Sequence, residues 1–364
     1  GFALVGPTVR DGAITYDTIE GASDLPAGWT EVQEPGRYRL ERRDDGALFG
    51  FASGSHSFKR TFFAPQVTLL RAKRKDGSFV VLDPPSAPPK PVALIGARAC
   101  DLNAIAIQDR VFLQGSSTDA SYAARRRGTF VVALQCGTAG GTCFCVSMNA
   151  GPEVTSGFDL ALTELLGAEH RFVVQVGSPE GRALLARVPY EPAEPADLAA
   201  AAEVPQRTRA AMGRTLDTTN IAGLLAETLD HPRWDEVATR CLACTSCTLA
   251  CPTCFCSTIE DTTDLTGQEA SRVQRWDSCF TLEHSYVHGG SVRASTKARF
   301  RQFVTHKLGT WIEQFGSSGC VGCGRCVTWC PVGIDLTEEV AALRGAPTRD
   351  AAADQSRALG AEEV

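Results

Sequence analysis

The feature that most constrains this chain of 364 residues is a cysteine motif that occurs twice. Both copies read C-x2-C-x2-C-x3-C-P, one from Cys241 to Pro252 and the other from Cys320 to Pro331. Cysteines at such short intervals let one tight loop donate three thiolates to a compact group, while the fourth cysteine begins the next segment and points away. The fold must therefore gather eight thiols: Cys241, Cys244, Cys247, Cys251, Cys320, Cys323, Cys326 and Cys330.

This spacing is typical of ferredoxins with two [4Fe–4S] clusters, in which the fourth cysteine of each motif binds the cluster of the other motif. The rule predicts one cluster on Cys241, Cys244, Cys247 and Cys330, and a second on Cys320, Cys323, Cys326 and Cys251. The alternative is structural zinc, but zinc prefers two separated C-x2-C knuckles. The gap between the motifs is long for a compact ferredoxin and has helical patterns, so we expect a helical ferredoxin domain.

The total of fifteen cysteines is high for this length, and it is odd. Secreted disulfide frameworks are usually short and even-numbered, so metal ligation in a reducing compartment explains the cysteines better. Cys100 and Cys136 each follow a predicted strand, and strand ends share one edge of a parallel sheet. We therefore predict a third [4Fe–4S] cluster, against the alternative of inert core thiols, on four cysteines: Cys100, Cys136, Cys143 and Cys145.

Three further cysteines, Cys254, Cys256 and Cys279, belong to neither group. With His284 or His288 they could bind a metal ion, but we favour their packing as thiols beside the ferredoxin clusters. The charged residues that flank Cys100, Arg98 and Asp101, either tune its site or form a surface ion pair.

Alternating strand and helix patterns before residue 189 indicate an α+β or α/β domain with a partly parallel sheet. Buried strands are predicted over 92–95, 130–134 and 172–176. Helices are predicted over 102–112, with Asp101 as the N-cap, and over 160–166 and 181–188. The Ala-, Glu- and Pro-rich stretch 189–215 predicts the end of this domain, which spans residues 1–215.

A mainly α-helical two-cluster ferredoxin domain is predicted over residues 216–346, where strand patterns become rare. The last residues, 347–364, are polar and Ala-rich and predict a loosely held tail. Within the ferredoxin domain, helices are predicted over 221–229, 232–240, 280–288 and 297–315.

Composition argues against several classes of protein. The net charge is −6, whereas nucleic-acid-binding proteins more often carry a basic excess, so we expect no nucleic-acid partner. No apolar run approaches the roughly 20 residues of a membrane span, and the first ten residues lack the pattern of an export signal. These observations predict a cytoplasmic protein with no membrane segment. The G-x-G-x-x-G and G-x-x-x-x-G-K-[ST] patterns are absent, so we expect no nucleotide or flavin site in this chain.

The first-domain cysteine pattern and the segments around it limit the protein families that the chain resembles. From about residue 60 to residue 340, the chain resembles the iron–sulfur β subunit of cytoplasmic NAD(P)-linked [NiFe] hydrogenases, also called sulfhydrogenases, and the related iron–sulfur component of anaerobic sulfite reductase. The residues before 60 match that pattern poorly. The segments that carry the resemblance are 96–102 (GARACDL), 136–148 with its TCFC, 231–234 (HPRW) and 275–279 (RWDSC).

The resemblance implies an electron-transfer protein that performs no bond chemistry alone. Its implied partners are a flavin-bearing subunit, which binds NAD(P)H, and the small and large hydrogenase subunits, of which the large one carries nickel and iron. We therefore interpret the chain as a relay between the flavin-bearing partner and the hydrogenase module. Two alternatives remain at this point, the electron-input subunit of a sulfite reductase and a zinc-binding scaffold without redox function.

Overall fold

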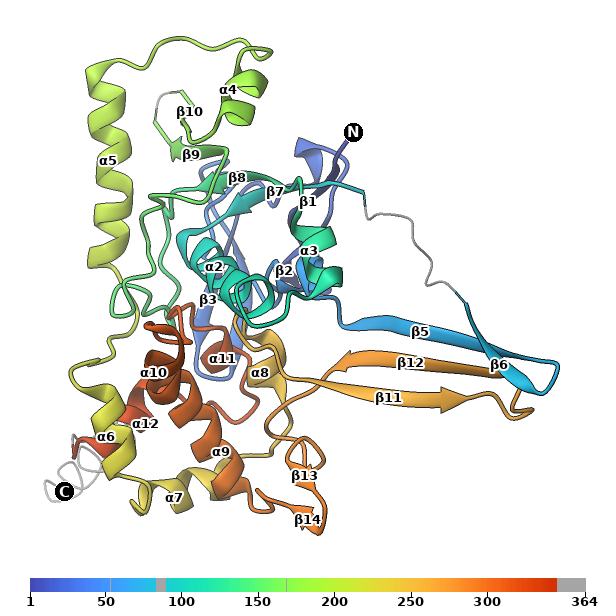
Figure 1. The fold of residues 1–364 in the computed structure, drawn as a ribbon. Coiled ribbons are helices and arrows are strands. Elements are labelled where there is room, and N and C mark those ends of the chain that lie inside the picture. Colours follow the sequence, from blue (N-terminus) through green and yellow to red (C-terminus); the bar gives the residue numbers. More distant parts are fainter. Residues whose placement is uncertain (53, 83–89, 168, 346–364) are drawn as a thin grey trace, which may run out of the picture.

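The computed structural model describes residues 1–52, 54–82, 90–167 and 169–345, so the predicted tail 347–364 lies outside the described residues. Figure 1 shows a body made of a sheet with covering helices and, below it in this view, a largely helical part that contains both cysteine motifs. An arm of strands projects from the body to one side. Among the described residues, no helix is both long and apolar enough to cross a lipid bilayer.

The body is built on a six-stranded sheet. Its four central strands are parallel, and an antiparallel strand closes each edge. The predicted strands over 92–95, 130–134 and 172–176 are confirmed. In spatial order the sheet contains β10 (Arg171–Val176), β9 (Leu160–Leu165), β8 (Phe130–Leu134), β7 (Val92–Ala97), β1 (Ala3–Arg10) and β2 (Ala13–Thr18).

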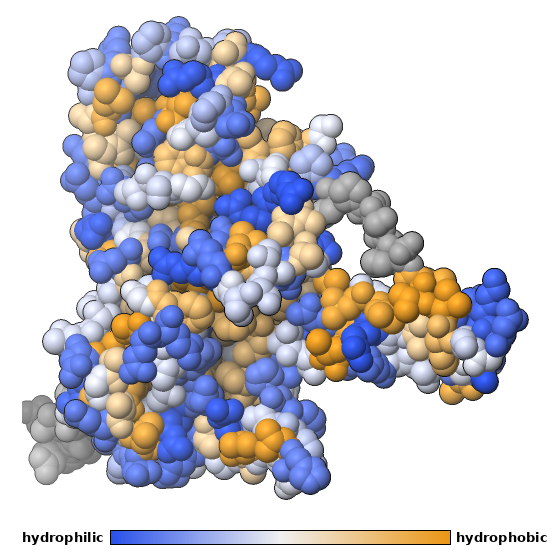
Figure 2. Space-filling model, in the orientation of Figure 1, coloured by the Kyte–Doolittle hydropathy of each residue, from blue (hydrophilic) through white to orange (hydrophobic). Residues whose placement is uncertain are grey.

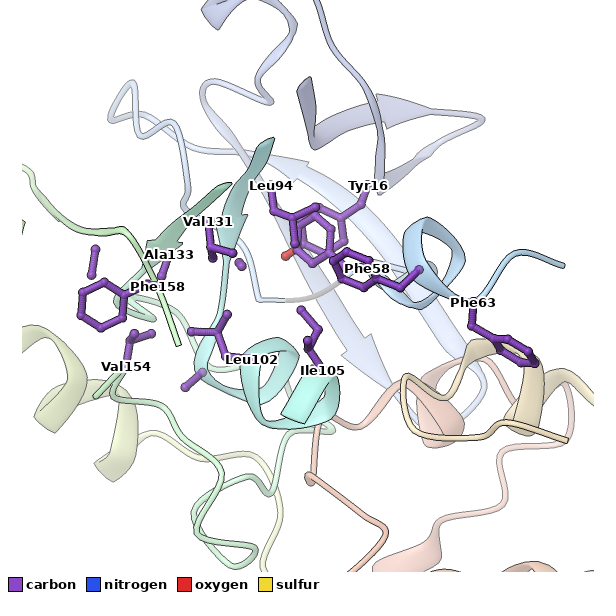
Figure 3. Packing of buried hydrophobic residues seen from close by; sticks show 14 of the residues in the cluster. Tyr16, Phe58, Phe63, Leu94, Leu102, Ile105, Val131, Ala133, Val154 and Phe158 are labelled. Carbon is purple, nitrogen blue, oxygen red and sulfur yellow. The ribbon is translucent and has the colours of Figure 1, made fainter. Parts of the chain in front are cut away.

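The helix α2 (Ala99–Leu113) follows β7 and packs onto the sheet. Figure 3 shows Leu102 and Ile105 of α2 close to the sheet residues Leu94 and Val131. Apolar runs such as β8 form central strands because both faces of a parallel sheet are covered. Other helices of the body are α1 (Lys59–Phe62), α3 (Ala120–Arg126), α4 (Pro179–Leu185) and α5 (Pro195–Ala210), and a short 3-10 helix, η1, spans Ala22–Asp24.

Two details of the predicted first domain are wrong. The segment predicted as a helix over 160–166 is the strand β9, because pairing with β8 on one side and β10 on the other outweighs the helical preference of its Leu, Ala and Glu residues. Asp101 is not the N-cap of α2. Arg98 occupies that position. Asp101 lies at the third helical position, and its carboxylate accepts a hydrogen bond of 3.3 Å from the backbone N–H of Arg98.

The projecting arm is a four-stranded antiparallel sheet that joins distant parts of the chain. Its order is β11 (Ser257–Thr263), β12 (Glu269–Trp276), β5 (Gln66–Lys75) and β6 (Ser78–Leu82). The strands β11 and β12 lie in the region where strand patterns looked rare. The sequence does not predict them because their outer residues are polar and solvent-exposed and form no buried apolar stripe. Figure 2 shows apolar residues on the arm, where Phe79, Val80, Val81 and Leu82 are all exposed.

The helical part has its own apolar core, which includes Trp234, Val237, Phe300 and Phe303. The helices predicted over 221–229, 232–240 and 297–315 are confirmed, the last with a π-helical turn, η2 (His306–Thr310), in its middle. Besides η2, this part contains α6 (Ile221–Glu227), α7 (Arg233–Arg240), α8 (Ser246–Ala250), α9 (Thr296–Thr305), α10 (Trp311–Phe315), α11 (Arg325–Thr328) and α12 (Leu336–Leu343).

The helix predicted over 280–288 is wrong. The chain there runs through turns into a small hairpin of β13 (Tyr286–Val287) and β14 (Gly290–Ser291). Gly289 and Gly290, at φ 103° and 135°, allow the reversal. The Asp277 carboxylate accepts hydrogen bonds from the Ser278 N–H and the Thr281 hydroxyl, which holds the preceding segment in a turn.

A second hairpin, formed by β3 (Trp29–Glu34) and β4 (Arg37–Arg42), reaches from the N-terminal region to the second cysteine motif. At its tip, Gly36 donates its N–H to the carbonyl of Val327 at 3.1 Å. A Cβ atom at Gly36 would lie 2.9 Å from the carbonyl oxygen of Cys330, so this close approach requires glycine. The N-terminal region therefore supports the loop that carries the cysteines.

Candidate iron–sulfur centres

The two cysteine motifs adopt the same backbone course. In each, the third and fifth residues have left-handed φ values: 49° at Ala243 and 68° at Thr245 in the first, and 64° at Gly322 and 73° at Gly324 in the second. A short helix then begins, α8 in the first motif and α11 in the second. These reversals curl each loop so that its first three cysteines can face a common point.

The fourth cysteine of each motif lies with the first three of the other. Cys330 lines a small cavity together with Cys241, Cys244 and Cys247, and Cys326 also lines it. Burial raises the pKa of Cys241, and the nearby Cys330 and Cys244 raise it further. Cys251 is likewise a neighbour of the first three thiols of the second motif, Cys320, Cys323 and Cys326. Burial raises the pKa of each of these three thiols, and the nearby Cys251 raises it further.

The surroundings of these sulfurs fit an iron–sulfur cluster. Backbone N–H groups donate to three of them, from Ala243 to Cys241 at 3.4 Å, from Gly322 to Cys320 at 3.4 Å and from Ile334 to Cys330 at 3.3 Å. Such hydrogen bonds stabilise negative charge on ligand sulfurs. The cavity beside the first motif is otherwise lined by apolar side chains such as those of Phe280, Phe300, Phe303, Ile334 and Leu336.

Lys307, in the π-helical turn η2, is a functional residue that the sequence analysis missed. Its ammonium group is buried and donates to the Cys251 sulfur at 3.3 Å, to the Thr253 hydroxyl at 3.0 Å and to the Gly319 carbonyl at 3.3 Å. The nearby Cys254 thiol lowers the pKa of Cys251, and the charge of Lys307 lowers it further against the effect of burial. No local motif marks Lys307, because it lies far from Cys251 in sequence.

The four first-domain cysteines lie close together and line one cavity. Cys100 lies in the first turn of α2 after β7, and Cys136 follows β8, which is parallel to β7. Cys143 and Cys145 lie on a loop held against the second motif by a hydrogen bond of 2.8 Å from the Phe144 N–H to the Gly322 carbonyl. One small cavity is lined by all four thiols and by Cys323, so this site adjoins the second motif.

Arg98 and Asp101 do not form a surface ion pair. Arg98 is 2% exposed and donates to the Cys136 sulfur at 3.2 Å. Asp101 is 1% exposed and accepts from the buried Arg325 guanidinium at 3.0 Å. Burial alone would lower the pKa of Arg98, but the thiol of Cys136 and other acidic groups nearby raise it, so Arg98 carries a positive charge at the four-thiol site.

The remaining three cysteines lie beside the predicted clusters. Cys254 is near Cys251 and lowers its pKa, whereas Cys279 and His284 are near Cys256 and lower its pKa. His288 is exposed and takes no part. Within the described ranges, no group of three or more His, Cys, Asp or Glu side chains has an arrangement that could hold a single metal ion.

Comparison with known proteins identifies relatives of the chain. The family model for a 4Fe-4S dicluster domain matches residues 240–334, which contain both cysteine motifs. A relative from Pyrococcus furiosus, sulfhydrogenase 2 subunit beta, is 30% identical over 336 residues, which cover 91% of this chain and 89% of the relative. No solved structure matches the chain.

Proposed function

Because the chain belongs to the family of sulfhydrogenase beta subunits, we propose that it relays electrons between a flavin-bearing subunit that binds NAD(P)H and a [NiFe] hydrogenase module. The observation that carries this proposal is the crossed grouping of the eight motif cysteines inside a dicluster domain. When bound, each [4Fe–4S] cluster takes up and releases one electron at a time. The protein contributes the thiolate ligands, the burial and the hydrogen bonds that set the reduction potentials.

We assign three sites to this relay. The eight motif cysteines would hold two clusters in the crossed arrangement, and Cys100, Cys136, Cys143 and Cys145 would hold a third. The fit of the third site rests on a donor set made only of thiols, on the small cavity that they line and on the positive charge of Arg98 beside Cys136. Cys323 lines the third cavity and belongs to the neighbouring cluster, so the two sites would be in electronic contact.

The three proposed sites differ in how deeply their cysteines are buried, and this difference suggests the order in which electrons pass between them. Cys143, Cys145, Cys251 and Cys323 are buried, whereas Cys244 is the one exposed cysteine among all fifteen, each of which is described. Electrons would therefore move between the third site, the cluster that contains Cys323 and Cys251, and the cluster that contains Cys244 near the surface.

Co-purification tests the proposed complex. The chain, isolated anaerobically with its natural partners, should be found together with a flavoprotein and with a nickel-containing subunit. Sirohaem instead of nickel would contradict the hydrogenase assignment and favour sulfite reductase. A colourless, zinc-loaded chain would contradict electron transfer altogether.

Iron content tests the number of clusters. The fully loaded chain should hold about twelve irons, four for each four-cysteine site, and at least about eight if only the motif clusters form. Cys136→Ser should remove about four of the twelve and leave the two motif clusters intact, because its thiol belongs to the first-domain site alone. Retention of all iron in Cys136→Ser would contradict the third cluster, and four or fewer irons in the native chain would contradict the two-cluster assignment.

A further inference from the structure

A thiol pair outside the twelve proposed ligands, Cys256 and Cys279, lies at the base of the projecting arm. The pair arises from the β11–β12 hairpin, in which Ser257 at the start of β11 pairs with Trp276 at the end of β12. One residue beyond this pair, the Asp277 N–H donates to the Cys256 carbonyl at 2.9 Å. The hairpin therefore fixes Cys256 beside the turn that contains Cys279.

The side chains of the two cysteines are neighbours, and the thiol and backbone N–H of Cys279 lower the pKa of Cys256. Two neighbouring thiols can reach the S–S bond length of about 2 Å by rotation of their side chains. Both residues are partly exposed, so reagents can reach them from solvent.

A histidine and an aspartate complete the arrangement. His284 lies near Cys256 and lowers the pKa of that thiol, and its Nδ1 atom lies 2.9 Å from Oδ2 of Asp277. The nearby Cys256 raises the pKa of His284 to about 9, and the hydrogen bond with Asp277 raises it in the same direction. A carboxylate that orients a histidine beside a thiol is the arrangement that activates cysteines as nucleophiles.

We propose that Cys256 and Cys279 form a redox-active dithiol, assisted by His284 and Asp277, that is oxidised reversibly to a disulfide. This inference rests on the proposed function in one respect, namely that the electrons of the dithiol are exchanged with the neighbouring clusters. The pair would give the protein one site that handles electrons two at a time, beside sites that handle them singly.

The step balances in atoms and electrons. On oxidation, one S–S bond forms between Cys256 and Cys279, and two electrons and two protons leave. The two motif clusters, in their oxidised form, would each accept one of the electrons. The proton of Cys256 is already held by His284 at neutral pH, and solvent accepts that of the partly exposed Cys279. Reduction reverses each of these transfers.

Thiol trapping on the iron-loaded full chain tests the disulfide. The protein is equilibrated without oxygen in mixtures of reduced and oxidised dithiothreitol, alkylated with iodoacetamide, digested and analysed by mass spectrometry. We expect a Cys256–Cys279 disulfide that forms and disappears reversibly while the iron content stays constant. Absence of this disulfide over the whole range of mixtures would overturn the proposal.

Variants separate a redox pair from a pair of metal ligands. Cys256→Ser and Cys279→Ser should each abolish the disulfide and keep the full iron content and cluster spectra, whereas loss of iron in either variant would overturn the proposal. His284→Gln should slow alkylation of Cys256 at pH 7 about tenfold or more, because thiolate is the reactive form. The matched control, His288→Gln, alters an exposed histidine of the same segment and should have no effect. Equal alkylation rates in the two histidine variants would exclude the role of His284.

A second measurement tests the exchange of electrons. The disulfide form of the iron-loaded chain, freed of dithiothreitol, is reduced with a one-electron viologen dye, and free thiols are counted. Appearance of the Cys256 and Cys279 thiols after reduction of the clusters supports the exchange, and a disulfide that persists beside reduced clusters overturns it. A chain that forms the disulfide but holds no iron would contradict the proposed function and leave the thiol chemistry standing.

Discussion

At the scale of single residues, a buried charge distinguishes two clusters that the motif alone makes equivalent. Lys307 donates to Cys251 from its ammonium group, whereas Cys330, the equivalent residue of the other repeat, accepts from the uncharged backbone N–H of Ile334. A positive charge beside a cluster stabilises its reduced form, because reduction adds negative charge. The cluster that includes Cys251 should therefore have the higher reduction potential of the two.

Lys307→Met removes this charge while keeping much of the side-chain volume. The potential of the cluster that includes Cys251 should fall by on the order of 60 mV, which is a tenfold change in a one-electron equilibrium. Redox titration followed by electron paramagnetic resonance would measure it. Lys297→Met is the control, since Lys297 pairs with Asp235 at the surface. Equal shifts of both clusters, or no shift, would refute the assignment.

Backbone strain in the first motif leads to a second prediction at this scale. Thr245 and Gly324 hold equivalent positions at φ 68° and 73°, a conformation that is costly for a β-branched residue. Thr245→Gly should raise stability by roughly 0.5–1 kcal/mol, since relief of strain exceeds the added chain entropy. Gly324→Ala should lower it by roughly 2 kcal/mol or more, because the new Cβ would lie 2.4 Å from the Thr142 carbonyl oxygen.

Anaerobic thermal unfolding of the iron-loaded variants checks both substitutions. The midpoint temperature should rise for Thr245→Gly and fall for Gly324→Ala. A fall for Thr245→Gly would mean that the Thr245 side chain makes a contact worth more than the strain it causes.

At the scale of elements, the last cysteine of each motif lies beside the other motif because α8 and α11 each carry the chain away from its own loop. Cys251 follows α8, and Cys330 follows α11, so each reaches the loop of the other motif. Cys251→Ser should therefore damage the cluster of the second motif, and Cys330→Ser that of the first. Spectra of the two single variants, with separate signals for each cluster, would decide this. Loss of the cluster of the same motif in each case would exclude the exchange.

The elements also show what the sequence could and could not reveal. The strands β7 and β8 were predictable because burial on both faces leaves an uninterrupted apolar run. The thiols Cys100 and Cys136 were predictable as neighbours for the same reason, since parallel pairing of these strands fixes their ends at one edge. The motif spacing alone predicts that Cys251 and Cys330 exchange clusters, and this remains a prediction.

Elements whose form depends on distant partners were not predictable. The polar strand β12 exists because it pairs with β5, from the other end of the chain, and β9 is a strand because its neighbours are strands. The contact of Lys307 with Cys251 and the approach of His284 to Cys256 likewise depend on tertiary packing, which leaves no local pattern.

At the scale of the whole molecule, the second motif adjoins both the four-thiol site near the sheet and the cavity that contains Cys244. The third site lies where the sheet meets the second motif, and Cys244, of the other cavity, is exposed. Leu242, two residues before Cys244, is 64% exposed. An exposed leucine beside an exposed ligand is typical of a contact surface, so we expect a partner protein to exchange electrons at this loop.

Leu242→Glu places a charge at the proposed point of contact without altering a ligand. Iron content should stay the same, because Leu242 is exposed and no ligand is altered, while electron transfer to the partner protein should slow at least about tenfold as the apolar contact is lost. Stopped-flow measurement of cluster oxidation by the partner would give the rate, and a small viologen dye should react at the native rate with the variant. The matched control is Leu198→Glu, at a 54% exposed leucine of α5 in the body. If Leu242→Glu and Leu198→Glu transfer electrons to the partner equally fast, the relay leaves the molecule at another surface.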